Sequence, residues 1–522
     1  MRLPSLQAFF ETPHAQWLAL PVGAALSLAF APLEWWPLAI LCPAYLFLSW
    51  YFAPSPRQAA KSGFLFTVGL FLAGTYWLYN TIHEIGHAPA WLAIFLMAAM
   101  VAILGGYTAA LGYALTRWAP SSAKRGRVGV GALSLLLYPA TYTLLEWFRG
   151  WFLSGFPWFA LGYSQTDSPL AGFAPVWGVY GISLLTAISA GALTVFLVGT
   201  KRERVAALAA VAVIWIAGAA LWQREWTRPI GRPLTVAIVQ GAVPQDMKWS
   251  IEYRDSTIDL YRDLTLPHLG KDIVLWPESA LPDMPDQLRD FMSWIWSRAR
   301  AKGTVLITGM LRYGKGGEDD IRNALLVLDE DAQWYDKRRL VPFGEFFPVP
   351  SFIREWMRLQ SLPYADITAG ERHQPALRAG GNRIGATICY EDAYGSEQLD
   401  VLKDATLLVN VTNDAWFGDT TAAPQHLQIS RMRVMEAQRP LLRAANDGIS
   451  ALILANGDVE KALPRFKPDV LTGVVQPRTG LTPYAHVGNW PVILLCAAVV
   501  AGTWTPLRRR PAARADAVQS QH

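Results

Sequence analysis

Apolar runs long enough to cross a lipid bilayer dominate this chain. A membrane-spanning helix needs roughly 20 predominantly apolar residues. Eight such runs lie at residues 15–33, 35–53, 62–82, 89–116, 129–148, 170–199, 204–222 and 488–507. Only 17% of the 522 residues are charged, against about 25% in ordinary soluble domains. The sequence therefore predicts a multi-pass α-helical membrane bundle of eight spans and excludes a single water-soluble globule.

Basic residues between the runs predict the orientation of the bundle. Short loops rich in Lys and Arg stay in the cytoplasm. Such residues cluster on alternate loops, at 57–61, 117–127 and 201–204, and again in the tail at 508–514. No small-residue cleavage site follows the first run, so we expect an uncleaved anchor. Both termini are predicted to be cytoplasmic, and residues 223–487 are predicted to face outward.

Composition divides the chain into four parts. Residues 1–222 form the predicted membrane domain with spans one to seven, 223–487 an exported domain, 488–507 span eight, and 508–522 a cytoplasmic tail. Most charged residues lie in the exported part, where the acidic ones slightly outnumber the basic ones. The formal net charge of +5 therefore comes from the flanking parts. A basic surface for nucleic acid is not indicated.

The exported domain consists of short apolar runs bounded by turn residues. Helical stretches at Ser250–Leu266, Asp286–Lys302 and Pro424–Gln438 separate these runs. Strands that alternate with helices predict an α/β layered domain. The strand candidates are Leu234–Gln240, Asp272–Trp276, Thr304–Leu311, Asn323–Leu328, Trp334–Arg338, Arg383–Tyr390, Thr406–Val411 and Ile449–Leu454.

Three polar residues, Glu278, Lys337 and Cys389, stand at or just beyond predicted strand ends, where α/β domains gather their chemistry. Cys389 is the only cysteine of the exported domain, so it has no disulfide partner there. A thiolate is a nucleophile, but a free thiol is mostly protonated at neutral pH and needs a neighbouring base or cation. Glu278 could take the proton, and Lys337 could stabilise the thiolate and then an oxyanion.

The segments around these residues resemble the nitrilase superfamily of carbon–nitrogen hydrolases. Residues 276–279 (Trp-Pro-Glu-Ser) are similar to its glutamate segment, and Lys337 with residues 342–345 (Pro-Phe-Gly-Glu) to its lysine segment. Residues 388–391 (Ile-Cys-Tyr-Glu) are similar to its nucleophile segment. The three segments occur in the order found in that superfamily. The resemblance implies an αββα sandwich.

Together with the predicted spans, the chain resembles the apolipoprotein N-acyltransferase family over nearly its whole length. Supporting segments are residues 240–249, 413–418 and 436–443 in the exported domain, and 146–165 in the membrane domain. Position 242 is an alanine, where that family carries a polar residue, which weakens any role for this position.

The resemblance implies a two-step acyl transfer. Cys389 would take a fatty-acyl group as a thioester from a membrane phospholipid, expected to be phosphatidylethanolamine. The N-terminal amine of a diacylglyceryl-cysteine apolipoprotein would then receive the acyl group. The resemblance implies no cofactor and no metal. It also implies the bacterial inner membrane, with the catalytic domain in the periplasm against the bilayer.

Further site candidates come from the same segments. Glu345 and Glu391 would orient Lys337 and Cys389, although carboxylates in a loop or at a helix start are nearly as plausible. The aromatic candidates could line an acyl pocket, but core packing is the default for such side chains. The remaining supporting or substrate-binding candidates are Trp249, Tyr390, Trp416, Phe417 and Glu436.

Three other readings of the chain compete with the transferase. Residues 83–87 spell His-Glu-Ile-Gly-His, the zinc-protease pattern, but Gly86 and Pro89 place it at a turn and the spans supply no convincing third ligand. A membrane-tethered amidase or nitrilase would use water as acceptor, yet such a hydrolase needs one anchor at most. A transporter would carry ionisable residues at mid-membrane, and these spans have almost none.

One segment of the exported domain is unusually apolar. The stretch from Phe343 to Leu362 holds several aromatic residues among prolines. Such surface is more than a solvent-facing loop should show. It predicts either a lid that dips into the bilayer or a buried core segment.

Overall fold

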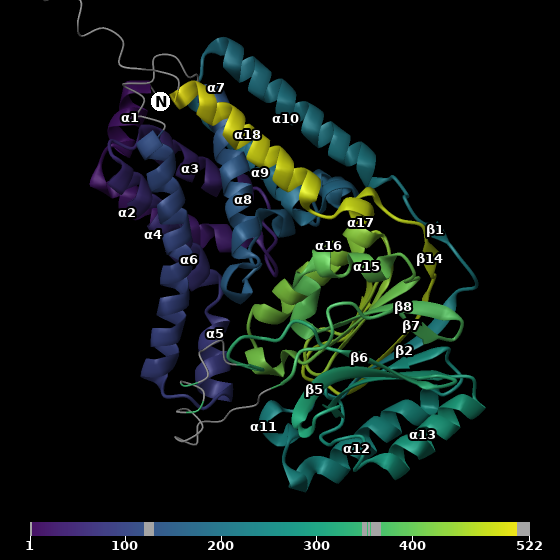
Figure 1. Cartoon of the computed structure of the whole chain (residues 1–522). Helices are drawn as coiled ribbons and strands as arrows, with labels where there is room; N and C mark the ends of the chain where they lie inside the picture. The colour runs from purple at the N-terminus through teal and green to yellow at the C-terminus, as the bar shows by residue number, and fades with distance from the viewer. Residues whose placement is uncertain (1–2, 119–129, 347–351, 353–354, 356–366, 509–522) are drawn as a thin grey trace, which may run out of the picture.

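The computed structural model describes residues 3–118, 130–346, 352, 355 and 367–508. A helical bundle and a layered α/β domain lie side by side (Figure 1). The N-terminus and the far end of the last helix lie close together, at the end of the bundle remote from the α/β domain (Figure 1). Most of the predicted lid falls outside the described residues.

The bundle is built from apolar helices, several of which are long. Thr200 and Glu203 form a capping box at the start of one of them, which is a sequence signal for a helix start. The helices are α1 (Leu3–Phe10), α2 (Pro13–Leu26), α3 (Leu38–Phe52), α4 (Pro56–Gly74), α5 (Trp77–Tyr79), α6 (Ala90–Trp118), α7 (Val130–Ala132), α8 (Tyr138–Arg149), α9 (Ala174–Val198), α10 (Lys201–Trp222) and α18 (Trp490–Arg508).

Helical segments occupy the positions of all eight predicted spans. Three are long and apolar enough to cross a membrane, namely α6, α10 and the segment Pro169–Val198 that ends in α9. The pair formed by α4 and Trp77–Ile85 passes the same test together but is bent by 58°. The count of eight spans therefore stays a prediction, because α2, α3, α8 and α18 do not pass this test.

Proline and glycine interrupt the fifth and sixth predicted spans. A π-helical stretch, η4 (Leu133–Leu137), precedes α8. In α9 the residue Gly178 has a φ of 63° and kinks the helix. A Cβ atom there would come within 2.3 Å of the Tyr484 ring, so the kink and the close approach both require glycine.

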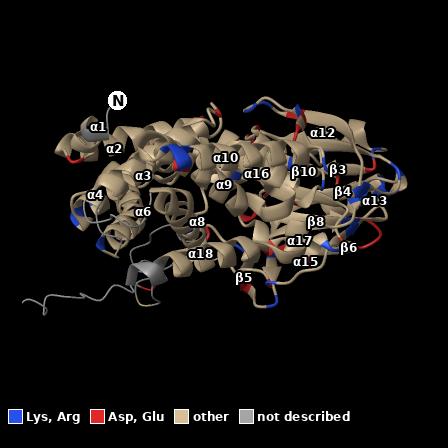
Figure 2. Ribbon diagram, turned by 90° about the horizontal axis from the view of Figure 1, so that it is seen from above, with Lys and Arg blue, Asp and Glu red and all other residues tan. Residues whose placement is uncertain are grey.

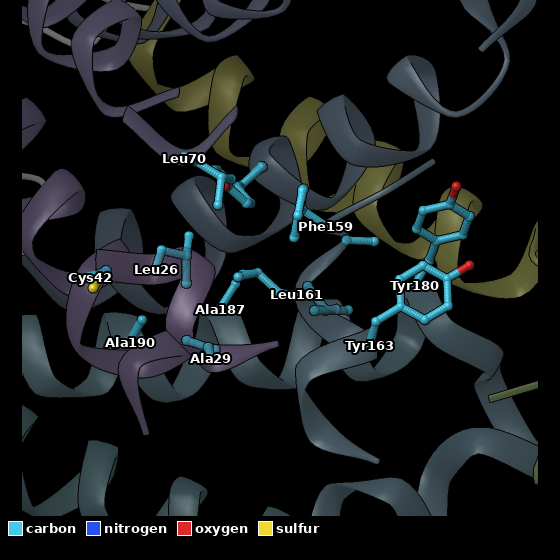
Figure 3. Close-up of a cluster of buried hydrophobic side chains, with 14 of the residues drawn as sticks. Leu26, Ala29, Cys42, Leu70, Phe159, Leu161, Tyr163, Tyr180, Ala187 and Ala190 are labelled. Atoms are coloured by element: carbon cyan, nitrogen blue, oxygen red, sulfur yellow. The ribbon is translucent and has the colours of Figure 1, made fainter. Parts of the chain in front are cut away.

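The bundle has a continuous apolar core with apolar side chains on its outer faces as well. Figure 3 shows part of this core, where α2, α3, α4 and α9 meet near Phe159 and Leu161. Large side chains such as Trp91 and Ile216 remain 70% exposed. Charged residues are sparse on the bundle and gather over the α/β domain (Figure 2). Such an outer surface suits lipid better than water.

The α/β domain contains two six-stranded sheets. Their strand orders are β13-β2-β3-β4-β5-β6 and β12-β11-β10-β9-β8-β7. The first sheet comprises β2 (Leu234–Gln240), β3 (Ile273–Leu275), β4 (Val305–Gly314), β5 (Gly317–Leu328), β6 (Ala332–Asp336) and β13 (Asp469–Val475). The second comprises β7 (Leu377–Ala379), β8 (Asn382–Ile388), β9 (Leu407–Thr412), β10 (Leu441–Ala445), β11 (Ala451–Ile453) and β12 (Val459–Ala462).

The two sheets pack face to face with helices on both outer faces (Figure 1). Alternate strand residues point to opposite layers: Val236 and Ile238 join the layer between the sheets, whereas Ala237 and Val239 pack toward the helices. α12 (Ile251–Thr265) and α13 (Arg289–Ala301) cover one sheet, and α15 (Leu399–Leu402) and α16 (Ala422–Ala437) cover the other. The αββα order implied by the resemblance is confirmed.

Helix α16 joins the two halves of the molecule. One side of it contributes Ile429 and Met432 to the core of the bundle. Another side packs Val434 and Ala437 against the second sheet. The short helix α17 (Pro483–Val487) then leads from the α/β domain into α18.

The predicted strands all exist, with shifted ends. One shift matters, because Cys389 lies outside β8 and not within Arg383–Tyr390 as predicted. The strands β7, β10, β12 and β13 and the short pair β1 (Arg228–Pro229) and β14 (Arg478–Thr479) were missing from the prediction. β13 pairs with β2 across more than 200 residues of sequence, and such long-range pairing leaves little local signal.

Candidate active site

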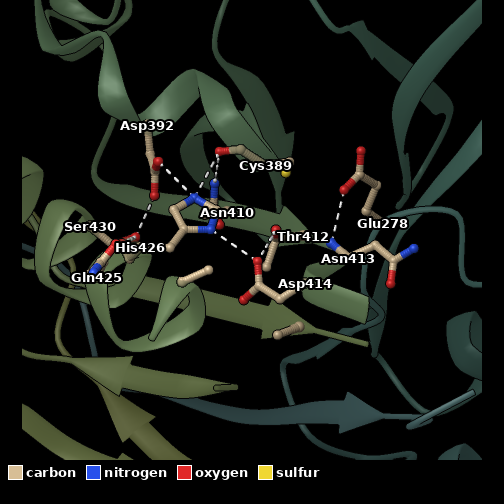
Figure 4. A network of polar contacts seen from close by, with 12 residues as sticks. Glu278, Cys389, Asp392, Asn410, Thr412, Asn413, Asp414, Gln425, His426 and Ser430 are labelled. Atoms are coloured by element: carbon tan, nitrogen blue, oxygen red, sulfur yellow. Dashed lines mark hydrogen bonds and ion pairs between the residues drawn. The ribbon is translucent and has the colours of Figure 1, made fainter. Parts of the chain in front are cut away.

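Cys389 is held in a strained backbone conformation directly after β8. It opens the short helix η9 (Cys389–Ala393) and has a φ of 51°, in the left-handed region that non-glycine residues seldom adopt. Strain of this kind persists where surrounding structure enforces it, often at functional sites. The sulfur faces the Glu278 carboxylate in Figure 4.

Glu278 lies beyond β3 on the opposite sheet, and its carboxylate accepts three hydrogen bonds. Oε1 accepts from Lys337 Nζ at 3.2 Å and from Asn323 Nδ2 at 2.7 Å. Oε2 accepts from the backbone N–H of Asn413 at 2.9 Å (Figure 4). A Cβ on Gly309 of β4 would come within 2.6 Å of the Glu278 Cα. Glycine there lets the neighbouring strand approach the turn that carries this carboxylate.

Lys337 follows β6 and is 1% exposed. Its Nζ donates to Glu278 Oε1 at 3.2 Å and to Glu345 Oε1 at 2.9 Å. Burial lowers the pKa of Lys337, but the carboxylates of Glu278 and Glu345 outweigh it and hold the pKa well above its usual value. The ammonium is therefore charged at neutral pH and stands between two acids.

The nucleophile itself is a protonated thiol at neutral pH. Burial, reinforced by the charge of Glu278, raises the pKa of Cys389, and Lys337 opposes this only in part. A thiol with a raised pKa attacks poorly unless a base removes its proton. The Glu278 carboxylate lies across from the sulfur in Figure 4, and the Lys337 ammonium donates to that carboxylate.

Glu345 lies where the sequence predicted, against Lys337. Besides Lys337 Nζ, its Oε1 accepts from Asn323 Nδ2 at 2.9 Å. Its Oε2 accepts from the backbone N–H of Val341 at 2.8 Å. The Asn323 amide therefore bridges Glu345 and Glu278, and the four side chains form one connected network.

Glu391 links the nucleophile segment to the lysine segment. Its carboxylate accepts from the backbone N–H groups of Ile388 at 2.8 Å, Arg338 at 2.6 Å and Arg339 at 3.1 Å. The Tyr335 hydroxyl donates to it at 2.9 Å. Because these donors flank Cys389 and Lys337, the buried carboxylate fixes the two segments relative to each other.

Tyr390 connects the site to the bundle. Its hydroxyl donates to the Gly155 carbonyl at 3.1 Å. The Tyr394 hydroxyl donates to Tyr390 at 3.0 Å. The Tyr390 ring stacks on Trp158, with ring centroids 5.9 Å apart. The residue next to the nucleophile is therefore seated on the loop that follows α8.

The other candidates are dispersed. Trp249 and Trp416 are 47% and 40% exposed, so neither is a core residue. Phe417 packs edge-on against Trp77 of α5, at 4.9 Å between ring centroids. Glu436 accepts from Arg433 at 2.9 Å and from the backbone N–H of Val179 at 2.7 Å. The structure therefore places Glu436 at the junction with α9, where none of its hydrogen bonds reaches the Glu–Lys–Cys group.

The sequence did not predict three residues that hydrogen-bond Glu278. Asn323 and Asn413 hydrogen-bond Glu278 as described above, and Lys248 Nζ donates to the Glu278 carbonyl at 3.0 Å. Lys248 is 1% exposed, and burial lowers its pKa to about 8. Lys248 and Asn413 belong to segments already singled out by resemblance, but asparagine and lysine are too common for spacing alone to mark them.

The His-Glu-Ile-Gly-His segment lies at a turn, as predicted. It runs through the π-helical η2 (Asn80–Ile85) to His87, which has a φ of 53°. His83 Nδ1 lies 2.8 Å from the Ala88 carbonyl. Among the described residues, no group of three or more His, Cys, Asp or Glu side chains could hold a metal ion.

The fold and the site define a carbon–nitrogen hydrolase domain joined to an apolar helical bundle. Family models give the same division. The model described as "Carbon-nitrogen hydrolase" matches residues 235–484, and the one described as "Apolipoprotein N-acyltransferase N-terminal domain" matches residues 22–192.

Relatives share the whole architecture. An apolipoprotein N-acyltransferase of Methylococcus capsulatus is 40% identical over 508 residues, which cover 97% of this chain and 99% of that protein. One of Azotobacter vinelandii is 40% identical over 512 residues, covering 97% of each. The chain belongs to the apolipoprotein N-acyltransferase family.

Two solved structures that resemble this chain each cover about half of it. An amidase from Nesterenkonia sp. is 19% identical, with a TM-score of 0.37, and covers 51% of this chain and 97% of its own. A carbon–nitrogen hydrolase from Helicobacter pylori has a TM-score of 0.36 at 14% identity and covers 55% and 99%. The fold assignment rests on the sheet topology and the family models.

Proposed function

We propose that this enzyme transfers a fatty-acyl group from a membrane phospholipid, through a thioester on Cys389, to the N-terminal amine of diacylglyceryl-cysteine apolipoproteins. The observation that carries the proposal is the buried Lys337, held between Glu278 and Glu345 beside Cys389, in a chain that matches N-acyltransferases end to end. The donor is phosphatidylethanolamine, attacked at its sn-1 ester.

The first half-reaction forms the thioester. Glu278 takes the proton of the Cys389 thiol, and the sulfur attacks the ester carbonyl carbon. Lys337 stabilises the oxyanion of the tetrahedral intermediate. The carbon–oxygen bond then breaks, the leaving alkoxide takes the proton from Glu278, and a lysophospholipid departs.

The second half-reaction uses the same groups in reverse. The apolipoprotein amine attacks the thioester carbon, and Glu278 accepts a proton from the nitrogen. The carbon–sulfur bond breaks and the proton passes to the departing thiolate. An amide is formed and the Cys389 thiol is regenerated, so the cycle needs no cofactor and no metal.

We place the catalytic domain, residues 223–487, in the periplasm and the eight spans in the bacterial inner membrane. Residues 1–222 hold seven spans, 488–507 the eighth and 508–522 a cytoplasmic tail. The one-sided Lys and Arg clusters support this placement, as does the proximity of α1 to the far end of α18 in Figure 1. Reporter fusions after residue 203 should read cytoplasmic and fusions after residues 87 and 330 periplasmic; a cytoplasmic signal at 330 would overturn it.

The remaining alternative is a tethered hydrolase that uses water as acceptor. Both activities begin with a Cys389 thioester, so they differ in its fate. A transferase site that excludes water should accumulate acyl-enzyme until an amine arrives.

The deciding experiment incubates the purified protein with phospholipid labelled in its acyl chain, and then adds a diacylglyceryl-cysteine peptide. The label should stay on Cys389 and move to the peptide on addition. Steady release of free fatty acid, unchanged by the peptide, would establish the hydrolase instead. Cys389→Ala is the control and should bind no label.

A further inference from the structure

A buried cluster of charges lies directly behind the nucleophile, on the side away from Glu278 (Figure 4). At its centre is His426 of α16, which is 1% exposed. His426 lies between two carboxylates, with Nε2 at 3.0 Å from Asp392 Oδ1 and Nδ1 at 3.0 Å from Asp414 Oδ1. Arg443 of β10 bonds to both carboxylates, at 3.3 Å each. The mechanism above uses none of these four side chains.

The imidazole also touches the backbone of the nucleophile. His426 Nε2 lies 3.2 Å from the carbonyl oxygen of Cys389. Both neighbours of Nε2, this carbonyl and Asp392, can only accept, so Nε2 must carry a proton and donate. This assignment holds whether the imidazole is neutral or charged. Its second nitrogen faces both Asp414 and Arg443.

The Cys389 carbonyl therefore has two side-chain donors. The second is Asn410 Nδ2 of β9, at 3.4 Å. A left-handed residue other than glycine is strained and persists only when its surroundings enforce it. Because the peptide group is planar and trans, fixing this carbonyl also fixes the following N–H of Tyr390. The side chains of His426 and Asn410 therefore hold the strained turn that carries the Cys389 sulfur.

The helix that carries His426 is itself bonded to the bundle one residue earlier. Gln425 Oε1 accepts from the indole N–H groups of Trp77 at 3.2 Å and Trp158 at 3.1 Å. Its Nε2 donates to the Gly74 carbonyl at 3.3 Å. The position of His426 is thus set by the bundle as well as by the sheet.

We propose that His426 is a positioning residue that aims the Cys389 sulfur, by donating from Nε2 to the Cys389 carbonyl and holding the left-handed turn in place. This inference rests on the proposed function, in which Cys389 forms the thioester. It adds a residue that touches neither substrate nor sulfur and acts through the nucleophile's backbone.

The test compares His426→Leu, which removes the donor, with His426→Gln, whose amide can still donate to the carbonyl. In each purified full-length variant the rate of acyl-enzyme formation from labelled phospholipid is measured over a range of donor concentrations. His426→Leu should lower the maximal rate by about 10²-fold, the loss expected from a small misplacement of a reacting group, with little change in the half-saturating donor concentration. His426→Gln should recover most of that rate.

Ser450→Ala is the matched control. It removes an equally buried hydroxyl that lies just before β11, outside this cluster, and donates to Gln240 Oε1 at 2.8 Å. It should lower the melting temperature without changing the rate of thioester formation. If His426→Leu does not fold, His426→Asn, whose shorter amide falls short of the carbonyl, takes its place in the comparison.

Two outcomes overturn the inference. One is an unchanged maximal rate in folded His426→Leu or His426→Asn, and the other is equal loss in His426→Gln and the variant without the donor. A failure of the proposed function would be recognised by a different result: Cys389→Ala would then still form acyl-enzyme.

Discussion

The bundle and the α/β domain use apolar side chains in opposite ways. In the α/β domain the apolar residues lie between the sheets and under the helices, and the charges lie outside or in paired clusters. In the bundle, only 11% of the apolar 18-residue stretch of α10 is buried inside the protein. In the segment that ends in α9, 78% of the corresponding stretch is buried. The hydrophobic effect drives the packing of the α/β domain in water. Under the proposed placement the bundle is surrounded by lipid, so its helices associate through van der Waals packing and interhelical hydrogen bonds.

The comparison also shows what buried charge requires. In the α/β domain Lys337 contacts two carboxylates, and His426 lies among two aspartates and an arginine. Burying an ion without such partners costs far more than burying an apolar group. These buried charges are therefore found with ionic and hydrogen-bonding partners, and each prediction below perturbs one side of this contrast.

The largest effect is expected from a change of Glu278 in the buried network around Lys337. Glu278→Gln keeps the size of the side chain but removes the base, so thioester formation should fall by roughly 10²–10⁴-fold. Rapid-quench measurement of acyl-enzyme from labelled phospholipid checks this. A wild-type rate in Glu278→Gln would mean that another group takes the proton.

A charge introduced on the outer face of each region should show whether that face contacts lipid or water. Val213 in the middle of α10 is 67% exposed, and Val213→Arg should cost about 2.5–3.5 kcal/mol of membrane insertion. Val474 of β13 is 50% exposed, and Val474→Arg should change stability by no more than about 0.5 kcal/mol. An insertion assay measures the cost of Val213→Arg, and thermal unfolding in detergent measures the effect of Val474→Arg. Equal tolerance at both positions would refute the proposed lipid contact of α10.

The His426 cluster should give the α/β domain a pH-dependent stability. Burial and Arg443 lower the pKa of His426, but Asp392 and Asp414 outweigh them and raise it to about 9. A raised pKa stabilises the fold fully below the unfolded value of about 6.5, and this contribution is lost as the pH rises through about 9. His426→Gln should lack that loss.

The measurement is the melting temperature of both proteins between pH 6 and pH 10. The difference between them is the quantity to follow, because Lys248 acts in the opposite direction. Burial lowers the pKa of Lys248 to about 8, so its contribution becomes more favourable as the pH rises. Parallel curves for wild type and His426→Gln would mean that the imidazole stays neutral throughout.

The smallest effect is expected at the exposed rim of the junction. Arg431 pairs with Asp167 at 2.6 Å, and the aspartate is 45% exposed. Arg431→Gln should cost about 1 kcal/mol, because solvent screens the aspartate although the Arg431 side chain is only 12% exposed. Gln425→Leu in the same helix should cost more, since it leaves two buried indole N–H groups unpaired. Thermal unfolding of the two variants compares their losses of stability. A larger loss in Arg431→Gln than in Gln425→Leu would contradict this prediction.

The sequence by itself determined the division into an apolar bundle and an α/β domain, because hydrophobic runs of about 20 residues and runs of about 6 are local signals. It also predicted that Glu278, Lys337, Cys389 and Glu345 belong to one site, since each lies in a short segment with a family-like pattern. It could not determine that Cys389 stands outside its strand in a left-handed turn, because a φ value is enforced by neighbours and not by the residue.

Tertiary structure alone decided which distant groups meet. Asn323, Asn413 and Lys248 reach Glu278 from three separate segments, and His426 reaches the Cys389 carbonyl from a helix 37 residues further along. Single asparagine, lysine or histidine residues have no distinguishing pattern in sequence. The contacts of Glu278 form when the two sheets pack face to face, and that of His426 forms when α16 packs on the second sheet. Such packing excludes water, and most buried polar groups then have a hydrogen-bond partner.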